Sequence, residues 1–147
     1  MDKEPLLFEY PVKENIRRFL RLESLFKSYQ KNSLSVDPEN HLHALKYLFE
    51  ILEMLSSGDS KAELIKELAK YIDYFKKLEQ NPNVEMSKLE NFLKQLNQLQ
   101  LWTINYDGKF GEKLRKDPFI SSVKQRSSIP GGNCQFDCPD LFLFMMK

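Results

Sequence analysis

The arginine residues are the side chains of this 147-residue chain whose spacing points most clearly to chemistry. All five fall in two short segments, one near the start of the chain and one between Lys109 and Arg126. The later segment carries six basic residues against two acidic ones, a net charge of +4. A planar guanidinium group forms paired hydrogen bonds with carboxylates and phosphates. The two segments therefore predict either a site for an anionic partner or solvated helix faces with local ion pairs.

The histidines and cysteines have spacings that do not suit a metal site. His41 and His43 are the only histidines, and residues two apart on a helix point in nearly opposite directions. We expect one exposed and one partly buried histidine. Cys134 and Cys138 would lie about 13 Å apart in an extended strand, too far for a disulfide. They are interpreted as two buried apolar thiols, with a structural metal or a redox role as alternatives.

Motifs typical of enzymes are missing from the sequence. Glu63 and Glu67 are helix-spaced carboxylates interleaved with lysines, which is typical of a solvated helix face. The segment 130–133 is glycine-rich, but no Gly-Lys-Ser/Thr follows it, so we predict a backbone turn and no phosphate loop. No serine or cysteine nucleophile motif occurs. An enzyme is the weakest class, and no cofactor or metal is expected.

The composition describes a folded protein of balanced charge. The net charge is +1, the charged fraction is 29% and the hydrophobic fraction is 41%. This balance excludes a strongly basic nucleic-acid arm, although it allows a local basic patch. No signal-peptide core follows the first residues, and the longest apolar run, Leu141–Met146, is too short to span a bilayer. We expect a soluble, cytoplasmic protein without a membrane segment.

Helical periodicity and capping signals divide most of the chain into helices. The expected helices run over 12–29, from Asp37-Pro38 to Gly58, from a capping box at 60–63 to Asn81, from a second capping box at 87–90, over 109–116, and from Asp117-Pro118 to Arg126. The short connections favour antiparallel neighbours. The fold class predicted for residues 1–127 is mainly α, an antiparallel helical bundle.

The pattern changes after Ser127. Cys134, Phe136 and Cys138 alternate with polar residues, and 141–144 reads as a buried strand. A lone apolar hairpin is not stable in water. We therefore expect residues 128–147 to be the first strands of a small β domain. Its remaining strands are expected either to follow in a longer protein or to come from another chain.

Three segments carry the most distinctive sequence features. They are Phe8–Pro11 with Glu14, Arg17 and Leu20–Glu23; Gly58-Asp59 with Glu63–Leu68; and Gln125–Gly132 with Cys134, Phe136-Asp137 and Pro139. In order and spacing they resemble the ZapD family across nearly the whole chain. The resemblance implies a cytoplasmic bacterial cell-division factor at the midcell ring, without catalytic activity. It also implies a helical domain joined to a β domain, a homodimer, and cross-linking of FtsZ filaments through the acidic FtsZ tail, which promotes Z-ring assembly at the septum.

Candidate contact residues for FtsZ come from two sources. Arg17 and Arg21 match basic positions of the family's opening motif, and Lys124 and Arg126 match the basic pair before the Ser-Ile-Pro-Gly-Gly motif. Three more residues are added on local charge alone: Lys113, Arg115 and Lys116.

Two alternative functions use the same basic residues. One is a helical module that binds nucleic acid, which the near-zero net charge and the lack of a recognisable reading helix make unlikely. The other is a helical adaptor for a different acidic or helical peptide.

Overall fold

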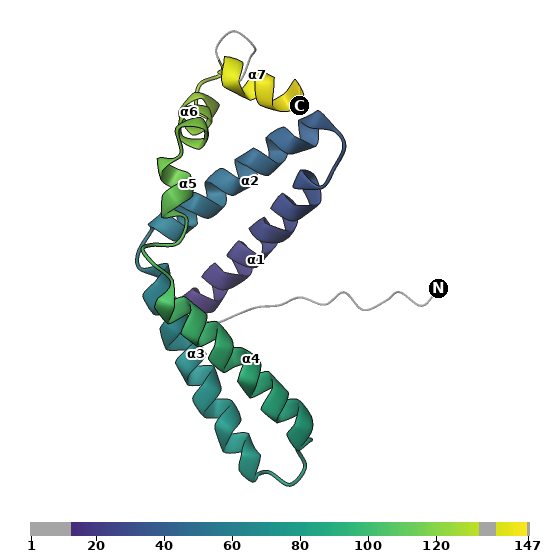
Figure 1. Cartoon of the computed structure of the whole chain (residues 1–147), viewed down its shortest axis with the longest axis vertical. Coiled ribbons are helices and arrows are strands. Elements are labelled where there is room, and N and C mark those ends of the chain that lie inside the picture. The colour runs from purple at the N-terminus through teal and green to yellow at the C-terminus, as the bar shows by residue number, and fades with distance from the viewer. Residues whose placement is uncertain (1–12, 133–137, 147) are drawn as a thin grey trace, which may run out of the picture. The chain divides into compact units, whose positions relative to one another are not determined.

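The structure, a computed structural model, describes residues 13–132 and 138–146 (Figure 1). Every regular element in these ranges is a helix, which confirms the mainly α prediction. The helices are α1 (Glu14–Ser33), α2 (Pro38–Ser56), α3 (Ser60–Lys77), the 3₁₀ turn η1 (Leu78–Gln80), α4 (Met86–Asn105), α5 (Glu112–Lys116), α6 (Pro118–Ser127) and α7 (Pro139–Met146). They belong to two compact units, a first over Met1–Ile51 with Phe142–Lys147 and a second over Leu52–Leu141.

In the first unit, α1 leads through a short loop into α2, which runs back in the opposite direction (Figure 1). The loop is held by Ser35, whose Oγ accepts hydrogen bonds from the Asp37 backbone N–H and the Asn40 side chain. Asp37 in turn accepts from the N–H of Glu39, so α2 begins at Pro38 as predicted. The buried apolar residues of this unit are Leu22, Ala44, Leu45, Phe49 and Ile51.

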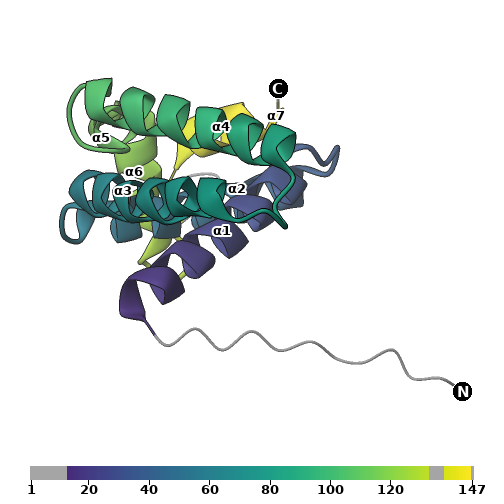
Figure 2. The same cartoon turned by 90° about the horizontal axis from the view of Figure 1, so that it is seen from below.

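In the second unit, α3 and α4 form a helical hairpin and lie side by side in both views (Figures 1 and 2). Ile72 of α3 is buried against Leu89 and Leu93 of α4. Phe75 and Phe92 cross this contact edge to face, with ring centroids 4.8 Å apart. Each fully buried side chain of this size stabilises the fold by about 1.5–3 kcal/mol, so these contacts fix the pairing of the two helices.

Both predicted capping boxes are displaced. The N-cap of α3 is Asp59, whose carboxylate accepts from the N–H of Ala62, whereas Ser60 already lies inside the helix. Helix α4 begins at Met86, and its N-cap residue Glu85 makes no side-chain capping bond. Asp59 supplies the hydrogen-bond acceptor that the prediction assigned to Ser60. The predicted N-cap of α3 was therefore wrong by one residue.

Two residues determine the backbone path of the basic segment between Lys109 and Arg126. Gly111 has φ +74° and is the N-cap of α5. A Cβ there would lie 2.7 Å from the side chain of the buried Leu52, so glycine is required both for conformation and for space. Asp117 closes α5 through its N–H to Leu114 and opens α6 by accepting from Ile120, as the Asp-Pro signal predicted.

The strand predicted over 141–144 is wrong, because these residues lie in α7. Pro139 stands at the first helical position and Asp140 in the first turn, both of which favour a helix start. Leucine and methionine are also better helix formers than strand formers. The alternating segment 134–137 lies outside the described residues, and the domain boundary between 127 and 128 stays a prediction.

Candidate partner-binding surface

Arg17 and Arg21 lie one turn apart on α1, and both lie beside the carboxylate of Glu14. The guanidinium Nη1 of Arg21 lies 3.2 Å from a carboxylate oxygen of Glu14, and that of Arg17 lies 3.9 Å from the other. The side chain of Arg21 is 60% exposed and that of Arg17 is 36% exposed. Exposed ion pairs of this kind contribute about 0.2–1 kcal/mol, so Glu14 orients the two arginines without holding them firmly. Both guanidinium groups stay partly exposed, so a partner could reach them.

Helix α5 presents its cations in three different ways. Lys116 donates to Glu112 at 2.9 Å, and this hydrogen bond, with the N–H of Lys109, lowers the pKa of the Glu112 carboxyl below its ordinary value. Arg115 is half-buried and donates to the carbonyl oxygen of Phe110 at 3.2 Å. Lys113 is exposed and makes no ion pair with any residue that the structure describes. Of these three cations, Lys113 is therefore the most available to an anion.

Lys124 and Arg126 are exposed in the last turn of α6. Cations at this end complement the helix dipole, which is the structural explanation for their position. The chain then enters a type II turn, with Pro130 and Gly131 at its centre and Gly131 at φ +70°. The N–H of Gly132 closes the turn on the carbonyl of Ile129 at 2.9 Å. The predicted backbone turn is thus confirmed up to Gly132.

The seven predicted contact residues fall into two groups. Arg17 and Arg21 belong to the first unit, and the five cations of α5 and α6 belong to the second. Helices α5 and α6 contact each other, so the structure brings the second group together along one short stretch of chain. All seven side chains are exposed or half-buried, as a binding surface requires.

The structure also contains an aromatic cluster that was not predicted from the sequence. Trp102, Tyr106 and Phe110 contact one another where α4 ends and the chain turns toward α5. Trp102 is 56% exposed, and the neighbouring Leu101 is 61% exposed. The four-residue spacing of three aromatic side chains could have revealed the cluster, but this spacing continues past Asn105–Gly108, whose residues are typical of a turn.

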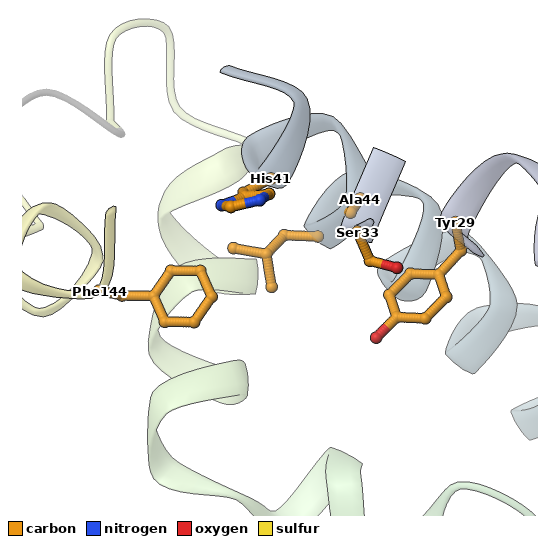
Figure 3. Close-up of a pocket in the computed structure, with 6 residues that line it drawn as sticks. Tyr29, Ser33, His41, Ala44 and Phe144 are labelled. Carbon is orange, nitrogen blue, oxygen red and sulfur yellow. The ribbon is translucent and has the colours of Figure 1, made fainter. Parts of the chain in front are cut away.

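Both histidines lie on α2, and one of them borders a hollow in the first unit. His43 is exposed and His41 is half-buried, as predicted, and His41 Nε2 donates to the carbonyl of Ser35. Six residues line the hollow beside His41: Tyr29, Ser33, His41, Ala44, Leu45 and Phe144 (Figure 3). The Ser33 hydroxyl donates to the carbonyl of Gln30, so it is not aligned with a base. The walls are otherwise mainly apolar.

Within the described ranges, no three acidic, histidine or cysteine side chains gather closely enough to hold a metal ion. Cys138 is a buried free thiol, as predicted, whereas Cys134 lies outside those ranges. None of the described helices has the length and apolar character needed to cross a membrane.

Comparison with known proteins decides the family. The model of the ZapD family, described as a cell division protein, matches residues 20–147. The chain belongs to the ZapD family. A ZapD cell division protein of Chromobacterium violaceum is 38% identical over 140 residues, and one of Azoarcus sp. (strain BH72) is 35% identical over the same length. Each match covers 95% of this chain but 56% of the ZapD relative, so the chain spans little more than half of their length. The resemblance inferred from the three sequence segments is confirmed, and with it a place in a family of cell division proteins.

Proposed function

We propose that this chain binds the tubulin-like division protein FtsZ through the acidic FtsZ tail and cross-links FtsZ filaments at the midcell ring. The observation that carries the proposal is the set of exposed and half-buried cations on α1, α5 and α6 in a member of the ZapD family. Lysine and arginine on these helices supply the positive potential that attracts a carboxylate-rich peptide. The proposal assigns no reaction to the chain.

Cross-linking of filaments depends on the number of tail-binding sites in one assembly. If two copies of the chain associate and each carries one tail site, the pair links two filaments. A filament presents many tails in a row, so weak single contacts add up to strong attachment. Contacts between exposed charges are screened over about 8–10 Å at physiological ionic strength, and binding should therefore weaken as salt increases.

The proposal is tested by reversing the two arginines of α1. Arg17→Glu with Arg21→Glu is expected to weaken binding of a labelled FtsZ tail peptide by roughly fivefold or more. Each lost exposed contact accounts for about 0.2–1 kcal/mol, and the new carboxylates add repulsion. Fluorescence anisotropy at low salt measures the affinity, and circular dichroism checks that the helices persist.

The matched control is Lys27→Glu with Lys31→Glu. It makes the same charge change at the same spacing in the same helix, and Lys27 also pairs with an acidic neighbour, Glu23. This control should keep an affinity within about twofold of the unmodified chain. Equal loss in both variants would point to net charge alone, and no loss in the Arg17 and Arg21 variant would remove these residues from the site.

A further inference from the structure

Helices α3 and α4 each carry a second stripe of side chains besides the one through which they pack together. The packing stripe contains Ile72 on α3 and Leu89 and Leu93 on α4. The second stripe, which we call the outer stripe, has spacings of three, four and three residues on each helix. Its members are Leu64, Glu67, Tyr71 and Tyr74 on α3, and Phe92, Gln95, Leu99 and Trp102 on α4. Residues at this spacing follow one side of an α-helix.

Both halves of the outer stripe lie on the same side of the α3–α4 hairpin. Tyr71 directly precedes the packed Ile72, and Phe92 directly precedes the packed Leu93. Each is therefore turned by about 100° in the same sense from the line of contact. In two antiparallel helices that lie side by side, the same sense of rotation leads to the same side of the pair (Figures 1 and 2).

Ring contacts join the two halves into one face. The Tyr74 ring meets Phe75 edge to face with centroids 5.2 Å apart, and Phe75 meets Phe92 in the same way at 4.8 Å. The large side chains of the outer stripe are between 41% and 58% exposed: Tyr71, Tyr74, Phe92, Leu99 and Trp102. Together they leave roughly 400 Å² of mainly apolar surface uncovered, a patch size that is often functional on soluble proteins.

The charges around the outer stripe are balanced. Residues 60–105 contain seven lysines and six acidic residues, a net charge of +1. Three ion pairs border the stripe, with N–O distances of 2.8, 3.1 and 2.8 Å: Lys70–Glu67, Lys77–Asp73 and Lys88–Glu85. The face therefore has little excess charge to attract an acidic peptide or a nucleic acid, and two copies of it can meet without strong repulsion.

We propose that two copies of this chain associate through the outer stripe, so that two α3–α4 hairpins form a four-helix bundle. Each helix of such a bundle contacts two neighbours and needs a stripe with three- and four-residue spacing for each of them. A two-fold axis places the α3 stripe of one copy against the α4 stripe of the other, and the two stripes have the same length and spacing.

The size of the patch suits an interface between two copies. A stable interface buries about 800 Å² on each partner, and a little over half of that area is apolar. The exposed part of the outer stripe supplies most of the apolar share, and the ion pairs beside it supply a polar rim. The inference rests on the proposed function for its role, since linking two filaments needs two copies. Association itself is measured without FtsZ, so the two proposals can fail separately.

The experiment measures the mass of the whole chain by sedimentation equilibrium over a range of concentrations. The unmodified chain is expected to approach twice the monomer mass. Tyr71→Gln with Tyr74→Gln should raise the dissociation constant of the pair about a hundredfold or more, because each substitution occurs twice in a two-fold interface and tyrosines are frequent hot spots. Both side chains are exposed, so circular dichroism should show unchanged helix content.

The matched control is Leu101→Gln with Ile104→Gln. These exposed apolar residues have the same spacing of three, and each lies two positions after a member of the outer stripe, on nearly the opposite side of α4. The control should associate within about twofold of the unmodified chain. Trp102 is the one tryptophan of the chain and gives a second readout. Its emission should move to shorter wavelength as the pair forms in the unmodified chain.

Three results would overturn the inference. They are a monomer at every concentration, which would leave the face to a different partner, a pair that the tyrosine substitutions leave intact, and a pair that forms without a change in Trp102 emission. The tyrosine variant should bind a labelled FtsZ tail peptide as tightly per chain as the unmodified protein does, but it should no longer link filaments. Absence of tail binding in the unmodified chain would overturn the proposed function and leave the interface between copies standing.

Discussion

Lys124→Glu with Arg126→Glu is expected to reduce the affinity for the FtsZ tail by roughly tenfold or more. Both side chains are exposed, and Lys124 makes no ion pair with any residue that the structure describes. Reversal therefore replaces up to two attractive contacts of about 0.2–1 kcal/mol each by two repulsive ones. The measurement is anisotropy of a labelled tail peptide at several salt concentrations, where the difference between variants should shrink as salt increases.

The control for this variant must reproduce its effect on the helix itself. Anions in the last turn of a helix oppose the dipole, at a cost of about 0.3–1 kcal/mol each. Lys76→Glu with Lys77→Glu also places two anions in the last turn of a helix, α3, where Lys77 pairs with Asp73. The control should lose similar stability and keep its affinity. A tail affinity unchanged by reversal of Lys124 and Arg126 would exclude the end of α6 from the site.

Gly132→Ala is expected to destabilise the chain by about 1–3 kcal/mol, the range for a residue forced into a strained conformation. A Cβ at this position would lie 2.2 Å from the carbonyl oxygen of Arg126 and 3.0 Å from Cβ of Ile129. The first of these contacts cannot be relieved by rotating a side chain, because the contacted oxygen belongs to the backbone. The turn must open, and the end of α6 that carries Arg126 must shift with it. Urea unfolding followed by circular dichroism measures the loss.

Gly131→Ala is the matched comparison for this turn. Gly131 has φ +70°, but a Cβ there would meet nothing within 4 Å. Alanine should lose only the conformational preference of glycine, about 1–2 kcal/mol, and the end of α6 should stay in place. Tail binding should fall for the Gly132 variant and hold for the Gly131 variant. Equal stability and equal binding for both would show that the close approach to Arg126 is not tight in solution.

The helices of the chain could be predicted because their local signals agree with their packing. Asp37-Pro38 and Asp117-Pro118 mark the starts of α2 and α6, and the side chains of Asp37 and Asp117 accept backbone N–H groups there. Leucine and phenylalanine residues at helical spacing predict an apolar face on α2 between Leu42 and Leu55, and three of its residues are buried: Leu45, Phe49 and Leu52. These features depend on a few neighbouring residues, so one sequence is enough to reveal them.

Features that depend on tertiary packing were predicted less well. On α1 the helical spacing predicts an apolar side that contains both Leu22 and Phe26, but Leu22 is buried whereas Phe26 is 51% exposed. On α3 the helical spacing predicts a face that includes Tyr71 and Phe75. Phe75 does contact α4, but Tyr71 is 45% exposed and the neighbouring Ile72 is buried against α4. In α7, a short apolar run suits a buried strand and a helix equally by periodicity. In each case, tertiary packing decides which side chains are buried or which secondary structure forms.

The charged residues of the candidate site could be predicted from the sequence, but the residues that they contact could not. The sequence identified the cations. The structure adds that Glu14 forms ion pairs with both Arg17 and Arg21, and that Lys116 forms one with Glu112. A turn was predicted over 130–133 from glycine and proline, and the structure closes it between Ile129 and Gly132. The close approach of Gly132 to Arg126 could not be predicted from the sequence, because it depends on tertiary structure. The aromatic cluster was missed because its three residues span a helix end, where no single periodicity applies.

Low-speed sedimentation of FtsZ polymers formed with GTP tests most directly whether this chain links filaments. We expect the chain to carry FtsZ into the pellet at low salt, and the combined reversal of Lys124 and Arg126 to leave it in the supernatant. A full-length ZapD relative serves as the positive control. If that relative pellets the polymers and this chain does not, filament linking by residues 1–147 is contradicted.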